Sequence, residues 1–583
     1  MCYDTPLCRP ETVAPGSSIE SGEAQIPAAA GSEGPGMQRQ YKTLLLAATL
    51  FGVAAGWAEE HEHGGAGSVR FPVSCSAPAK NTFQHGVALL HSFWYEEAEK
   101  TFRQAAVQDS ACAMAWWGVA MCRNHPLWAA PTRADLENGS AAVEKARLAR
   151  PGTQREADYI QAVGAFYRNW ETVAHRDRVA AWSKAMRQLA ARYPQDREAS
   201  IFYALSLIAT SPPSDMAYRN QKRAAEILNR ILPEQPDHPG IFHYLIHSYD
   251  TPKLAILALT AARQYSKVAP AVPHALHMPS HVFTRLGLWD ESISSNLASA
   301  AAAREHAAKS LPGVTPQDQL HAMDYLEYAY LQTGRDSEAR RIVEQAAAIS
   351  SVDHEVIQAA YAFAAIPARY ALERKQWSDA AKLELRPAGF PWPRFRFAEA
   401  IHHFARALGA ARSGDPGIAR RDVEALKSIH SALADAQQDY DWASQVEVQR
   451  LAAEAWVLHA EGRHDEALTM MRSAAALEEK TEKHPATPGP VLPARELIGE
   501  MLMDLNRPGL AVREFEAVSR AAPNRFNSLY ASARASELSG QHWRARQRYQ
   551  QLLAVAGSAD GRILELANAR AYLAVPHRSA VHK

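Results

Sequence analysis

The chain has 583 residues, of which 47% are hydrophobic and 22% are charged, so it can bury a core and is not disordered overall. Lys plus Arg and Asp plus Glu both number 63, and this balance gives no electrostatic reason to expect nucleic acid or an anionic membrane as a partner. The length favours several domains or one long array of repeats.

The first 58 residues have the composition of segments that precede a folded protein. Residues 1–36 are rich in Gly, Pro, Ser and Ala and are expected to be disordered, with Met37 as the true start and the preceding residues an over-extended gene prediction. Residues 37–58 have a basic start, an apolar run at 44–55 and an expected cleavage site after Ala58, which is the build of a secretory signal peptide. This predicts a periplasmic or secreted bacterial protein without an integral membrane domain after cleavage. The alternative is an uncleaved anchor.

Export would leave three cysteines in the mature protein, Cys75, Cys112 and Cys122. Three is an odd number, so at least one thiol stays free or pairs elsewhere. An oxidising compartment permits one bridge. Cys112 and Cys122 are expected to lie too far apart along helical structure to meet, and Cys75 can pair with either of them.

Helix-length amphipathic segments recur between a linker at residues 59–79 and a tail at 576–583. Their pattern is a small residue, a larger apolar residue four positions later and a proline eight positions after that. It occurs at Ala224, Leu228 and Pro236, again 34 residues later at Ala258, Ala262 and Pro270, and more weakly at Ser292 and Asn296. No stretch alternates with period two, so almost no sheet is expected. The region rich in proline and aromatic residues at 387–397 is expected to join an array at 80–386 to a second array at 387–575, and residues 481–493 to form a long loop.

Histidines are concentrated in the repeats that follow residue 237. Six of the chain's 24 histidines fall within 44 residues: His238, His243, His247, His274, His277 and His281. His243 and His277 are 34 residues apart, as are His247 and His281. Histidines four residues apart lie on one face of a helix, so the repeat spacing should bring the two pairs together.

This period and pattern resemble the tetratricopeptide repeat, a helix–turn–helix unit of 34 residues, and the resemblance covers roughly residues 80–560. It implies an all-α fold, an α-solenoid of antiparallel helix pairs whose first helices line a concave groove. The motifs HSFWYEEA, AWWGVAM and HALHMPSHVFTRLGLWDES are also similar to a group of exported bacterial repeat proteins without an established activity.

The resemblance places one polar stripe on three successive first helices. The candidate metal ligands are His243, His247, His277 and His281. The residues expected beside them in the ligand groove are His274, His321, Asp324 and Asp250. Neutral imidazole suits one transition-metal ion, zinc or copper. The two other interpretations are direct contact with a ligand and hydrogen bonds between neighbouring helices.

Two functions of different classes remain open. The first is an exported solenoid that binds a protein, peptide or small ligand in the groove, with the histidine patch as its selective surface. The alternative is a metal-dependent enzyme, a hydrolase or oxidoreductase, that uses the same histidines. The sequence has no HExxH motif, phosphate-cradling glycine loop or GxSxG elbow, so it identifies no catalytic residue.

Overall fold

The structure is a computed structural model that describes residues 65–127, 130–212, 215–436, 440–561 and 563–575. The predicted signal peptide and the tail at 576–583 lie outside the described residues. Among the described residues the regular elements are helices, and the one β-bridge joins Thr315 to Val352. The prediction of an all-α fold is confirmed. No helix of the described segments is long and apolar enough to cross a membrane.

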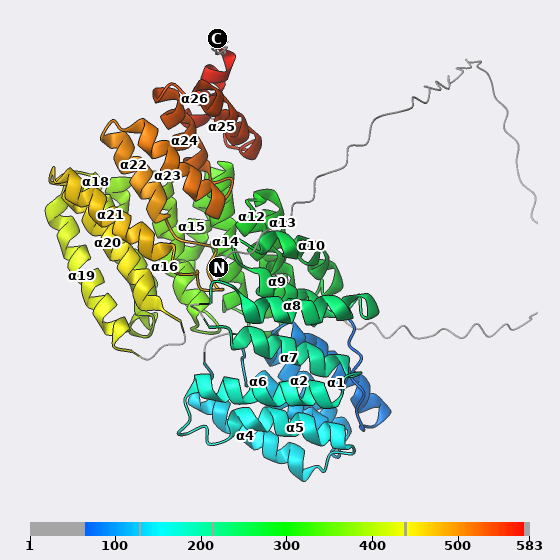
Figure 1. The fold of residues 1–583 in the computed structure, drawn as a ribbon. Coiled ribbons are helices and arrows are strands. Elements are labelled where there is room, and N and C mark those ends of the chain that lie inside the picture. Colours follow the sequence, from blue (N-terminus) through cyan, green and yellow to red (C-terminus); the bar gives the residue numbers. More distant parts are fainter. Residues whose placement is uncertain (1–64, 128–129, 213–214, 437–439, 562, 576–583) are drawn as a thin grey trace, which may run out of the picture. The chain divides into compact units, whose positions relative to one another are not determined.

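The first of three apolar cores is built by helices up to α12, and consecutive helices pack side by side (Figure 1). The helices are α1 (Ala77–His91), α2 (Tyr95–Gln108), α3 (Ala113–Cys122), α4 (Arg133–Leu148), α5 (Gln154–Tyr167), α6 (His175–Arg192), α7 (Arg197–Ala209), α8 (Arg219–Ile231), η1 (Leu232–Glu234), α9 (Pro239–Tyr249), η2 (Ala255–Ala258), α10 (Leu259–Val268), α11 (Pro273–His277) and α12 (Pro279–Leu286).

The second core begins at Trp289 and continues without a break past the predicted joint at residues 387–397. Its helices are α13 (Trp289–Ser310), α14 (Gln317–Thr333), α15 (Asp336–Ala348), α16 (Ile357–Glu373), α17 (Trp377–Ala380), η3 (Trp392–Arg394), α18 (Arg396–Arg412), α19 (Pro416–Ala434), α20 (Trp442–Ala460), α21 (His464–Glu478), α22 (Ala494–Asp504) and α23 (Pro508–Ala521). A small third core joins α24 (Phe526–Leu538), α25 (His542–Val555) and α26 (Leu564–Ala574).

The repeat period is visible in the positions at which two helices start, and a glycine follows the end of two others. Helices α9 and α11 start at Pro239 and Pro273, 34 residues apart, and proline suits a first helical position because the N–H it lacks has no partner there. Helices α12 and α14 end at Gly287 and Gly334, whose φ angles of 65° and 70° are in the left-handed region. Both helices are thereby stopped before α13 and α15 begin.

The C-terminal repeats contact helices from the middle of the chain. The indole of Trp289 donates a hydrogen bond to the backbone oxygen of Asn524 (2.8 Å). The fully buried guanidinium of Arg525 makes contacts to three helices, and its partners are Tyr328 on α14, Glu373 on α16 and Glu496 on α22. Removing one partner of a buried ion pair leaves an uncompensated charge, so these contacts fix the C-terminal repeats against α14.

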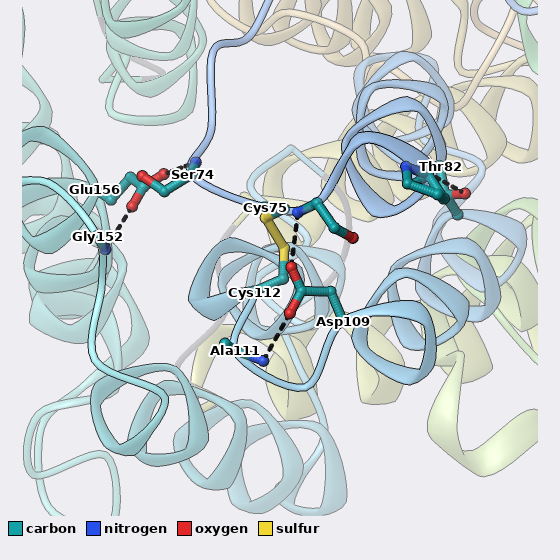
Figure 2. Close-up of a disulfide and its surroundings, with 10 residues drawn as sticks. Ser74, Cys75, Thr82, Asp109, Ala111, Cys112, Gly152 and Glu156 are labelled. Carbon is teal, nitrogen blue, oxygen red and sulfur yellow. Dashed lines mark hydrogen bonds between the residues drawn. A yellow bond between two sulfur atoms is a disulfide. The ribbon is translucent and has the colours of Figure 1, made fainter.

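A disulfide between Cys75 and Cys112 ties the segment before α1 to the turn between α2 and α3 (Figure 2). The carboxylate of Asp109 accepts hydrogen bonds from the backbone N–H groups of Ser76 (2.7 Å) and Ala111 (3.0 Å) beside the bridge. Cys122 is buried with a free thiol. Of the two pairings that the sequence leaves open, the structure contains the one with Cys112.

We expect the double substitution Cys75→Ser/Cys112→Ser to lower the free energy of unfolding by roughly 4 kcal/mol, because the bridge restricts a long loop of the unfolded chain. Urea unfolding with and without a reductant measures the effect. A reductant should destabilise the wild type and leave the double variant unchanged. Cys122→Ala is the matched control and should keep its sensitivity to the reductant. Equal stability of reduced and oxidised wild type would contradict the prediction.

Candidate functional site

The candidate site is formed by six histidines on the first helices of three successive repeats. Helix α9 carries His243 and His247, α11 carries His274 and His277, α12 carries His281, and α14 carries His321. All are buried except His247, which is half-buried. The sequence predicts four of them as metal ligands and places His274 and His321 beside those four.

Three of these histidines, His243, His247 and His274, form what we call the first histidine group. The Nε2 atom of His243 lies 3.0 Å from Nε2 of His247 and 3.2 Å from Nε2 of His274. The Nδ1–H of His243 donates to the backbone oxygen of His91 (2.7 Å). A neutral imidazole has one N–H, so Nε2 of His243 carries a lone pair that faces two other imidazole nitrogens.

The second histidine group consists of His277, His281 and His321. The Nε2 atoms of His277 and His281 are 3.0 Å apart, and the ring centroids of His277 and His321 are 4.3 Å apart. Ligand atoms of the three residues all lie within 4.8 Å of one another, as they do in the first group. Neither ring nitrogen of His321 has a hydrogen-bond partner among the described residues.

The outer nitrogens of His277 and His281 are held by acceptors from α13 and from the residue that follows α9. The Nδ1–H of His277 donates to Oδ1 of Asn296 (2.6 Å), whose own amide donates to the backbone oxygen of Ser292 (2.8 Å) and so fixes which atom faces the histidine. The Nδ1–H of His281 donates to Oδ2 of Asp250 (3.0 Å). Both Nε2 atoms therefore carry lone pairs, and these face each other at 3.0 Å.

Burial keeps these imidazoles neutral. It lowers the pKa of His243, His274, His277 and His321 well below the usual histidine value, and neighbouring histidines lower the pKa further. Burial also lowers the pKa of His247 to about 3. Neutral rings with outward N–H groups and inward lone pairs are the form in which histidine binds metal ions.

The two histidine groups adjoin. His274 and His277 belong to the same short helix, and their ring centroids are 6.2 Å apart. The ring centroids of His247 and His281 are 6.4 Å apart, and the two rings meet edge to face at 67°. These distances are those of aromatic rings in contact, so the two groups are neighbours.

Asp250 connects the second group to the loop between α21 and α22. Its carboxylate accepts from Nε of Arg285 (3.0 Å) and from Nζ of Lys483 (3.1 Å) in addition to His281. Burial alone would raise the pKa of Asp250, but the charges of Lys483 and Arg285 hold it well below its usual range. Burial lowers the pKa of Lys483 to about 8. The loop expected at residues 481–493 thus reaches the histidine site.

A cavity of about 1430 Å³ extends to this site. His247, Asp250 and Lys483 contribute to its wall, and α6, α7, α19 and α20 provide other parts. A second cavity of about 500 Å³ lies beyond the same loop and is lined by Tyr328, Tyr361 and other aromatic residues. The first cavity gives a ligand a route to the histidines.

Two other clusters near the site are held together by ion pairs and charged hydrogen bonds. Asp324, predicted as a groove residue, is buried and paired with Arg369 (2.8 Å). Glu198 accepts from Nε2 of His91 (2.9 Å) and Nε2 of His238 (2.8 Å), and these histidines hold its pKa at about 2 against the effect of burial. These hydrogen bonds account for the arrangement of His91, Glu198 and His238.

The sequence analysis does not identify three residues that orient or border the site. The hydroxyl of Tyr325 on α14 lies 3.4 Å from Nε2 of His281. Its position four residues after His321, on the same face of the helix, is the sequence feature that could have identified it. Asn296 occupies a position where the repeat pattern has an apolar residue, and this departure marks it. Lys483 has no signal in the sequence beyond its place in a long loop.

No protein-family model and no curated protein matches the chain. Among solved structures it is similar to the APC/C hetero-tetramer Cut9–Hcn1 (12% identity, TM-score 0.30, 85% of this chain and 90% of that chain). It is also similar to IFIT1 with m7Gppp-AAAA (11%, 0.35, 80% and 95%) and to yeast Tom70 (11%, 0.31, 85% and 95%). These are solenoids of the tetratricopeptide type, and at such values the likeness carries no argument about function.

We expect Asp250→Asn to lower the free energy of unfolding by about 3–5 kcal/mol, because Lys483 and Arg285 lose the carboxylate that compensates their buried charges. Urea unfolding measures the change. Asp290→Asn is the matched control, since this carboxylate is exposed and also bonded to an arginine, and its effect should stay below about 1 kcal/mol. Equal effects of the two substitutions would contradict the role of Asp250.

Proposed function

We propose that the chain is a metal-binding solenoid protein that holds two transition-metal ions, one in each histidine group, beside a ligand cavity. The observation that carries the proposal is the pair of Nε2 atoms of His277 and His281, which face each other at 3.0 Å while both Nδ1 atoms donate elsewhere. Two lone pairs in this position repel each other, and a cation between them replaces repulsion with attraction.

A proton is the competing cation. Burial and the neighbouring His321 and His281 lower the pKa of His277 well below its usual value, so an imidazolium is disfavoured at this place. A metal ion instead binds neutral imidazoles through their lone pairs. Two nitrogens that are 3.0–3.2 Å apart and each about 2.0–2.1 Å from one ion subtend an angle of roughly 100° at the ion, which suits a three- or four-coordinate site.

The cavity supports a ligand-binding role for the same site. His247 lies at its wall, so a small molecule or a segment of a peptide or protein in the cavity can meet the first metal ion. An enzyme that activates such a ligand with the metal ions, as a hydrolase or an oxidoreductase, is the alternative to a binding protein.

The disulfide supports the export that the sequence predicts. A bridge between Cys75 and Cys112 persists in oxidising compartments and is rare in the cytosol of most bacteria. We propose a periplasmic or secreted location on this ground together with the signal-like segment at residues 37–58.

Metal analysis tests the proposal. Protein stripped with a chelator and dialysed against zinc or copper should retain two ions per chain. Its melting temperature should rise, because an ion at 1,000 times its dissociation constant stabilises the folded state by about 4 kcal/mol. His277→Ala should lose one ion and part of the rise.

His306→Ala is the matched control, since this histidine is partly exposed and outside both groups, and it should retain both ions. Asn296→Leu should keep the three ring nitrogens of the second group and weaken metal binding about 10- to 100-fold, because the outer N–H of His277 loses its acceptor. An equal metal content in wild type and His277→Ala would refute the proposal.

A further inference from the structure

The chemistry of the six histidines limits which metal ions the two groups can bind. The inference drawn from it concerns the same histidines and so rests on the proposed function. We propose that the two histidine groups hold a pair of copper ions, and that the reduced pair binds one molecule of dioxygen between the two ions. The inference assigns an oxygen-binding reaction to a site for which metal binding alone is proposed above.

The ligands are exclusively imidazoles. Neither histidine group contains a carboxylate or a thiolate. Carboxylate oxygens suit magnesium, calcium and manganese, whereas imidazole suits copper, zinc, iron and nickel. The carboxylate of Asp250 is already bonded to the outer nitrogen of His281, to Arg285 and to Lys483. The carboxylate of Asp250 therefore orients His281 and is not itself available to bind the metal ion.

The charge of the surroundings favours a monovalent ion. Two divalent ions with six neutral ligands would bring four positive charges into a buried space, where Asp250 already faces the cations Arg285 and Lys483. Uncompensated buried charge is costly. Copper(I) is the common biological ion that binds imidazole and carries a single charge. A copper(I) pair therefore brings two positive charges into the site instead of four.

Each group supplies three ring nitrogens to its ion. Three nitrogens complete a stable coordination shell for copper(I), while copper(II) takes additional ligands. The rings of the two groups are in contact at His274 and His277 and at His247 and His281, so the ions of the two groups would be neighbours. A diatomic molecule can then bind one ion with each of its atoms.

The surroundings suit an oxygen ligand. The hydroxyl of Tyr325 lies 3.4 Å from Nε2 of His281 and donates to its lone pair. When an ion takes that lone pair, the O–H of Tyr325 becomes available to donate to a bound oxygen atom. The cavity at His247 gives dioxygen a route to the first group.

The reaction balances without a proton or a further reactant. Each copper(I) ion gives one electron and becomes copper(II), and dioxygen accepts both electrons. Two copper–oxygen bonds form, and the oxygen–oxygen bond order falls from two to one. One copper ion supplies only one electron, so both histidine groups are needed for this step.

The experiment loads metal-free full-length protein with a copper(I)–acetonitrile salt under nitrogen and then admits dioxygen. Copper analysis should give two ions per chain, and an oxygen electrode should record one dioxygen consumed per chain. The absorption spectrum should gain a charge-transfer band. The copper signal in electron paramagnetic resonance should integrate to far less than two spins, because adjacent copper(II) ions couple through the shared ligand.

Variants separate the two groups. His321→Ala should keep one copper ion in the first group and lose the uptake of dioxygen together with the band. His247→Ala removes a ligand from the first group, at the cavity wall, and should also abolish the uptake of dioxygen. It serves as the second variant if His321→Ala does not fold. His306→Ala should behave like the wild type. Circular dichroism and melting temperature verify the fold of each variant.

The outcomes distinguish this inference from the proposal on which it rests. Two bound copper ions without dioxygen uptake, or with two full independent spin signals, would overturn the oxygen reaction and leave metal binding intact. Retention of zinc but not copper would overturn the choice of metal. Failure to retain any metal would refute both.

Discussion

The arrangement of the candidate site depends on the direction in which each buried imidazole donates its one hydrogen. His243, His277 and His281 donate outward through Nδ1 to a backbone oxygen, an amide oxygen and a carboxylate. The Nε2 lone pairs of His277 and His281 consequently face each other, and the donor that the described residues offer them is the hydroxyl of Tyr325, 3.4 Å from Nε2 of His281. A neutral ring has a single N–H, so no choice of tautomer lets His277 and His281 keep their outer hydrogen bonds and also bond to each other through Nε2. A cation between these two Nε2 atoms, as proposed above, would replace the repulsion between their lone pairs with attraction.

The surrounding helices hold this geometry from several directions. Helix α14 brings His321 to the site, while farther along the same helix Tyr328 is bonded to Arg525 from the C-terminal repeats. Lys483 reaches Asp250 from the loop that precedes α22. Near the start of α9, a side chain on Gly240 would place its Cβ 2.6 Å from Nδ1 of His91, so the absence of a side chain lets that ring and its carbonyl approach. The C-terminal repeats therefore contribute to a site whose six histidines all precede residue 322.

The sequence predicts much of the fold and part of the site, for a physical reason. A fixed repeat places equivalent residues on neighbouring helices, so the 34-residue spacing correctly indicates that His243, His247, His277 and His281 lie near one another. The spacing does not indicate which histidines belong to the first histidine group and which to the second. Residues three apart on a helix differ by about 60° around its axis, so His274 turns towards α9 while His277 turns towards α14. The contact of Lys483 with Asp250 joins repeats that are far apart in the sequence, and no local sequence pattern predicts such a contact.

Departures from the repeat pattern are more informative at this site than agreement with it. Asn296 replaces the apolar residue that the pattern requires, and its amide fixes the hydrogen of His277. The cluster of His91, Glu198 and His238 provides an internal comparison, because its carboxylate lies between the two imidazoles and accepts a hydrogen bond from each. In the second histidine group the carboxylate of Asp250 lies on the outer side of His281 instead. The same residue types thus give a closed ion-pair network in one place and lone pairs that face each other in the other, and the position of the carboxylate decides between the two arrangements.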